Sequence, residues 1–126
     1  MVEVTDDEFE AMVEAGVDAI PAKFAKFMDN VAVTWAPMPD FWQRLKARLT
    51  PGRLLFGLYE GVPKTSRGNY YSGVLPDKIT IFKWPHEYVA QDKEHLAELV
   101  KITVWHEVAH HFGLNDKEIH RRQKKT

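Results

Sequence analysis

The segment from Asp92 to Phe112 constrains the fold most strongly, because its apolar residues recur at a helical period. Asp92 is a suitable N-cap, and Gly113 follows the last periodic residue, where a left-handed helix stop is expected. The core side of this predicted helix consists of branched apolar residues: Leu96, Leu99, Val100, Val104 and Val108. A helix of about 20 residues is about 30 Å long, so the rest of the 126-residue chain must be arranged around it.

Helices are also predicted in the first half of the chain. Thr5 and Glu8 have the spacing of a capping box at the start of an acidic, apolar-periodic segment that ends before Pro21. A shorter helical piece should follow, with Phe24, Phe27 and Met28 on its buried side. Asp40 could cap a further helix running to about residue 49, whose shared face carries Phe41, Trp42, Leu45 and Leu49.

Three strands are predicted between and after these helices. Residues 31–35, 54–59 and 78–84 are rich in β-branched and aromatic side chains, and Pro85 is expected to end the third strand. Pro51 and Gly52 predict a turn, and residues 61–73 a polar, glycine-rich loop. The order of helix, strand, helix, strand, strand, helix predicts an α+β fold, with the long helix packed on one face of a small sheet.

Length and composition narrow the class of protein. A chain of 126 residues predicts one domain over residues 1–126, and 44% hydrophobic content excludes a mostly disordered chain. No apolar run approaches the roughly 20 residues that cross a bilayer, and the acidic N-terminus lacks a signal-peptide pattern. We therefore expect a cytoplasmic protein without a membrane partner. Without cysteines, any metal must be held by His, Asp or Glu.

Charge is distributed unevenly along the chain. Residues 1–22 contain acidic side chains and no Lys or Arg, whereas residues 117–126 carry Lys117, Arg121, Arg122, Lys124 and Lys125 against Glu118. A basic tail can attract nucleic acid. No recognition helix or basic stripe elsewhere supports that function, so we interpret the tail as a solvated terminus and expect no nucleic-acid partner.

The long helix also carries the residues with the clearest chemical meaning. His106 and His110 are four residues apart, which places both imidazoles on one face of the helix, within reach of a single zinc ion. Glu107 follows the first histidine in the pattern H-E-x-x-H. In metalloproteases with this pattern, the glutamate is not a ligand but the general base that accepts a proton from the attacking water.

Catalytic zinc usually has three protein ligands, so a third ligand is needed. Gly113 allows a sharp turn after the helix, and Asp116 lies where metzincins have their third histidine, in the layout H-E-x-x-H-x-x-G-x-x-D. An Asp there resembles the small snapalysin-type proteases. Glu118 or His120 could replace Asp116, although few residues remain for a thermolysin-type arrangement. His111 points about 100° away from His110 and is interpreted as a packing residue.

Other candidate residues have simpler interpretations. His86 and His95 belong to no motif and are expected to be surface or capping histidines. Tyr70 and Tyr71 could stabilise an oxyanion, but packing against the sheet is the favoured role. All methionines precede the motif, so no Met-turn follows Asp116 and the chain is not a full metzincin.

The chain resembles a family of small bacterial zincin-like metallopeptidases, long classed as a domain of unknown function. The resemblance covers nearly the whole chain, most specifically the segments Tyr71–Ile79 and His106–Asp116. It implies a minimal zincin fold with a small mixed sheet against the active-site helix. It also implies metal ligation by His106, His110 and Asp116, with Glu107 as the base.

These observations together predict a zinc-dependent peptidase with one Zn²⁺ per chain and a peptide or protein substrate. Iron, cobalt or nickel would also suit two histidines and a carboxylate. Zincins commonly pair the substrate backbone with an edge strand, and residues 78–84 are the candidate edge. The alternative is a metal-binding or peptide-binding domain that has lost proteolysis, although Glu107 would not be needed in a purely structural site.

Overall fold

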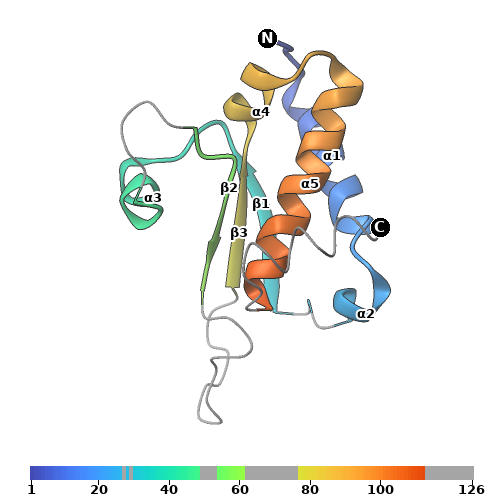
Figure 1. The fold of residues 1–126 in the computed structure, drawn as a ribbon, viewed down its shortest axis with the longest axis vertical. Helices are drawn as coiled ribbons and strands as arrows, with labels where there is room; N and C mark the ends of the chain where they lie inside the picture. The colour runs from blue at the N-terminus through green and yellow to red at the C-terminus, as the bar shows by residue number, and fades with distance from the viewer. Residues whose placement is uncertain (27, 29, 49–53, 62–76, 113–126) are drawn as a thin grey trace.

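A computed structural model describes residues 1–26, 28, 30–48, 54–61 and 77–112. These residues form three strands and five helices (Figure 1). The elements follow one another as α1 (Asp6–Asp18), α2 (Ala22–Ala25), β1 (Val31–Ala36), α3 (Phe41–Lys46), β2 (Gly57–Glu60), β3 (Asp77–Phe82), α4 (Lys83–Val89) and α5 (Lys93–His111). None of the helices in these ranges has both the length and the apolar character needed to cross a membrane.

The described strands form one mixed sheet in the order β1-β3-β2. β1 runs parallel to β3, with Val31 opposite Asp77, and β2 runs antiparallel to β3, with Glu60 opposite Lys78. The predicted α+β fold with a small mixed sheet is therefore confirmed. The assignment of residues 78–84 as an exposed edge is wrong, because β3 is the central strand and its backbone pairs on both sides.

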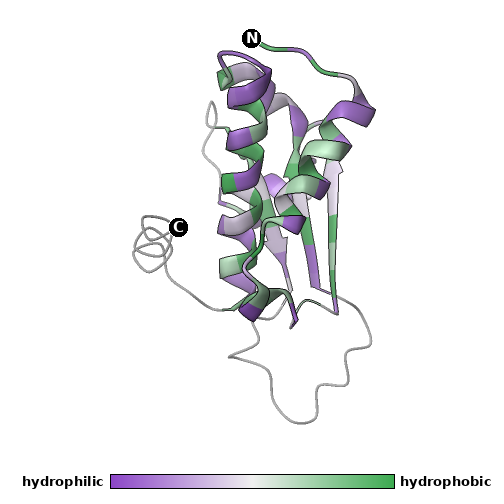
Figure 2. Ribbon diagram, turned by 90° about the vertical axis from the view of Figure 1, so that its right-hand side faces the viewer, coloured by the Kyte–Doolittle hydropathy of each residue, from purple (hydrophilic) through white to green (hydrophobic). Residues whose placement is uncertain are grey.

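α1 and α5 lie together on one side of the sheet (Figures 1 and 2). The core between these layers combines Phe9 and Val13 of α1 with the apolar side of α5 and with Ile79 and Ile81 of β3. The capping box at the start of α1 is confirmed, since the Thr5 side chain accepts from Glu8 N at 3.1 Å. Gly16 allows close packing of the two helices, because a Cβ there would lie 3.0 Å from Val104 Cγ2.

Two element boundaries in the first half of the chain differ from the sequence-based prediction. α3 ends at Lys46 rather than near residue 49, with Arg48 in a left-handed conformation (φ 52°). The predicted shared face of this helix points to solvent, because Phe41, Trp42 and Leu45 are all exposed. The second strand begins at Gly57 instead of residue 54. Phe27 and Leu49 lie outside the described residues.

α4 was not predicted, because Pro85 was expected only to end a strand. The chain instead turns directly from β3 into α4, with Pro85 in the first helical turn. Proline is tolerated there, since the missing N–H would have no partner within the helix. α4 also anchors the N-terminus: Val2 N donates to the Glu87 carbonyl at 3.0 Å, and Val4 N donates to its side chain at 2.9 Å.

Candidate metal centre

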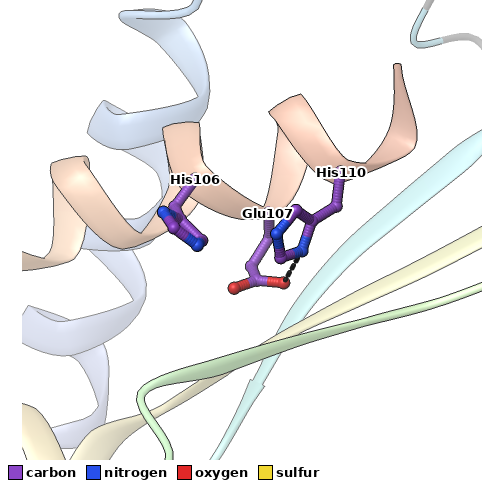
Figure 3. Close-up of side chains that lie close together, drawn as sticks. All are labelled: His106, Glu107 and His110. Atoms are coloured by element: carbon purple, nitrogen blue, oxygen red, sulfur yellow. Dashed lines mark ion pairs between the residues drawn. The ribbon is translucent and has the colours of Figure 1, made fainter. Parts of the chain in front are cut away.

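The last two turns of α5 bring His106, Glu107 and His110 together (Figure 3). The imidazole rings of the two histidines are 4.8 Å apart between centroids, as expected for positions i and i+4. Glu107 lies between them, with Oε1 3.3 Å from Nδ1 of His110. The helix alone therefore supplies two nitrogen donors and one carboxylate on a shared face.

α5 is held in place at both its start and its buried side. The Asp92 side chain accepts a hydrogen bond from His95 N at 2.7 Å, which satisfies a donor that the first helical turn leaves free. Along the core side, Val100, Val104 and Val108 are fully buried. With these valines packed against α1 and the sheet, the face bearing the two histidines turns outward, and both histidines are half-buried.

Glu107 is more enclosed than His106 and His110, because strand β2 passes directly beneath it. A Cβ on Gly57 would lie 2.8 Å from Thr103 Cγ2 and 3.1 Å from Cγ of Glu107. Only glycine allows the strand to approach so closely. The side chain of Glu107 is 8% exposed, whereas that of His110 is 36% exposed. The carboxylate thus lies at the base of a site that opens at the histidines.

The three residues fit a divalent metal in donor chemistry and approximately in spacing. Their possible ligand atoms all lie within 4.8 Å of one another. Two nitrogens bound tetrahedrally to zinc at 2.0–2.1 Å would be about 3.4 Å apart, so a modest side-chain rotation closes the difference. Two imidazole nitrogens beside a carboxylate are donors of the kind that zinc binds in proteins.

The predicted third ligand cannot be placed against this group. Asp116 and its alternatives Glu118 and His120 lie outside the described residues, as do Tyr70, Tyr71 and the basic segment 117–126. Their roles therefore stay predictions.

His111 is turned away from the other two histidines, as its angle on the helix predicted. It is fully buried, and its Nδ1 donates to Oδ2 of Asp77 at 2.8 Å. The same oxygen accepts a hydrogen bond from the Tyr59 hydroxyl at 2.7 Å. Sequence reasoning missed Asp77 and Tyr59. The sequence offered one signal, an acidic residue immediately before the predicted third strand.

His86 is a core residue, and the expectation of a surface or capping role is wrong. It is fully buried between the rings of Phe9 and Phe56. Its Nδ1 donates to the Phe82 carbonyl at 2.6 Å, and its Nε2 lies 2.8 Å from the Thr103 hydroxyl. His95 matches its expected role at a helix start, since its Nδ1 accepts from Gln91 N.

Burial of His86 makes the stability of the fold depend on pH. Desolvation lowers the pKa of His86 below its ordinary value of 6.5, and the hydrogen bond to Phe82 opposes this shift only in part. Below about pH 6.5, His86 is therefore protonated more readily in the unfolded chain than in the folded chain. As a result, the free energy of unfolding decreases as the pH decreases. The contribution of neutral His86 to the stability of the folded state is fully present above pH 6.5.

An NMR titration should show that His86 becomes protonated only below pH 6.5, and the urea midpoint of unfolding should decrease over the same pH range. A His86 pKa above 6.5 would contradict this prediction.

Comparison with known proteins adds one match. A sequence model of the family described as zincin-like metallopeptidase matches residues 28–126, which include α5 and the whole sheet. No curated protein matches the chain.

Proposed function

The chain belongs to the zincin-like metallopeptidase family, and from that premise we propose that it is a zinc-dependent peptidase with its active site on the outward face of α5. The observation that supports this most directly is the clustering of His106, Glu107 and His110 within 4.8 Å. In this proposal the two histidines bind the metal through ring nitrogens, and Glu107 is the general base.

Each residue has a distinct part in hydrolysis. Zinc, when bound, would supply a Lewis acid that polarises the scissile carbonyl and makes water more acidic. The Glu107 carboxylate would accept the proton of the attacking water and later deliver it to the leaving amine nitrogen. Its position between the two histidines, beside the site that the metal would occupy, suits this role.

Asp116 is proposed as the third ligand. Gly113 directly follows Phe112, the C-cap residue of α5, and glycine permits the sharp change of direction that would bring a carboxylate back to the histidines. Carboxylate oxygen bonds zinc at about the same length as imidazole nitrogen does.

For the substrate we propose an extended peptide lying along β2. Within the described sheet, β2 is an edge strand, and Gly57 places it against Glu107. An extended peptide can add to such an edge through main-chain hydrogen bonds. This arrangement would bring a peptide bond to the open side of the histidines.

The first test is the metal content of tag-free protein, measured by elemental analysis beside a proteomic peptide-library digestion. We expect about one zinc per wild-type chain, as in single-ion catalytic sites, and cleavage that stops on chelation and returns with zinc. His106→Ala and Asp116→Ala should each lose most of the metal. Full zinc occupancy in Asp116→Ala would move the third ligand elsewhere, whereas bound zinc without any cleavage would favour a non-proteolytic binding domain.

A further inference from the structure

One buried carboxylate joins the end of α5 to two strands of the sheet. Asp77, the first residue of β3, is 1% exposed. Its Oδ2 accepts from His111 Nδ1 at 2.8 Å and from the Tyr59 hydroxyl at 2.7 Å. The rings of Tyr59 and His111 also meet edge to face, with centroids 5.9 Å apart. The three side chains therefore form a polar cluster.

The backbone after β2 is shaped around the same carboxylate. Gly61 has a φ of 155°, a conformation that side chains with a Cβ rarely adopt. A Cβ on Gly61 would also overlap Asp77, whose Cγ lies 2.7 Å from that position. The Asp77 carboxylate therefore occupies the space that a side chain at position 61 would need. Its hydrogen bonds then connect β3 to Tyr59 of β2 and to His111 of α5.

The cluster meets α5 in the turn that carries a proposed metal ligand. His110 and His111 are adjacent, so any rotation or fraying of this turn moves both side chains. The final carbonyls of a helix have no partners within the helix, and helix ends open more readily than helix centres. A side-chain tether from His111 to the sheet opposes such opening at the residue next to the ligand.

We propose that Asp77 is a positioning residue for the metal centre. Through His111, it holds the last turn of α5 so that His110 faces His106. The effect on metal binding that this inference predicts rests on the proposed function. A buried polar cluster of this kind contributes little net stability compared with apolar packing, so its value lies in the orientation that it specifies.

The test compares Asp77→Ala, Asp77→Asn and a matched core control, Ile81→Ala. Ile81 is fully buried on the same strand but takes no part in the polar cluster. Two readouts are measured on each variant of the full chain: the affinity for Co²⁺ with its visible absorption spectrum, and the hydrogen-exchange rates of residues 110–112 without metal. Unfolding midpoints show how much general stability each variant loses.

We expect Asp77→Ala to weaken Co²⁺ binding by about 10–100-fold, as loss of an outer-shell partner typically does, and to change the absorption spectrum. Exchange at residues 110–112 should rise by about tenfold or more relative to the centre of α5. Asp77→Asn should recover most of the affinity, because its amide oxygen can accept from His111. Ile81→Ala should lower the midpoint without selective change in either readout.

Equal weakening of Co²⁺ binding by Asp77→Ala and Ile81→Ala at matched stability would overturn the proposal. Unchanged exchange at residues 110–112 in Asp77→Ala would also overturn it. If Asp77→Ala does not fold, Tyr59→Phe, which removes one donor and creates no cavity, is measured by the same criteria. If the wild-type chain binds neither Co²⁺ nor Zn²⁺, the proposed peptidase function fails, and the exchange rates alone decide whether Asp77 holds the turn.

Discussion

Replacing Glu107 with Gln is expected to lower kcat for peptide hydrolysis by about 10²–10⁴-fold while the zinc content stays unchanged. Gln has nearly the same shape as Glu but cannot accept a proton at neutral pH. Because Glu107 is proposed as a base and not as a ligand, His106 and His110 should still hold the metal. Cleavage of a peptide identified in the library digestion gives kcat, and elemental analysis gives the zinc content.

Glu98→Gln is the matched control, because Glu98 is an exposed glutamate on the same helix. This variant should leave kcat and the zinc content unchanged, which would exclude a general effect of removing a charge from α5. Full peptide cleavage by a zinc-loaded Glu107→Gln variant would rule out the base mechanism and would point to a contaminating protease or another base.

Phe9→Ala is expected to lower the free energy of unfolding by about 3–5 kcal/mol, the usual cost of removing a large core aromatic. Phe9 is fully buried and connects α1 to two other parts of the core. Its ring meets Trp35 of β1 edge to face, with centroids 5.7 Å apart, and lies 6.0 Å from the His86 ring. Since small domains are stable by only about 5–15 kcal/mol, this loss would leave a substantial unfolded population. Urea denaturation measures the effect.

Phe41→Ala provides the same chemical change at a solvent-exposed position, since Phe41 is 66% exposed. It should change the free energy of unfolding by no more than about 0.5 kcal/mol. If Phe9→Ala lowered the free energy of unfolding as little as Phe41→Ala does, α1 would not contribute to the core as described.

The elements that the sequence predicted well depend on local interactions. Residues within one helical turn determine the caps at Thr5 and Asp92. The spacing of four residues likewise places His106 and His110 on one face of the helix. The family resemblance supplied the mixed sheet. These features explain why the face of α5 that carries His106 and His110 was identifiable without a structure.

The features that were missed depend on contacts between distant residues. His111 and Asp77 are 34 residues apart, and no local pattern pairs them. The burial of His86 follows from Phe9, Phe56 and Thr103, which lie on other elements. The central place of β3 likewise depends on which strands pair with it, and the alternation of side chains along one strand does not reveal its neighbours.

The packing of α1 against the C-terminal half of the chain has a consequence for folding kinetics. Lys93 on α5 pairs with Glu8, 85 residues away, and Glu87 accepts a hydrogen bond from Val4, 83 residues away. β3 must also pair with β1, although β2 lies between these two strands in the sequence. Such high contact order slows folding, because long loops close before native contacts repay their entropy. During synthesis, α1 leaves the ribosome before α5, so its apolar side stays accessible to chaperones until α5 has been made.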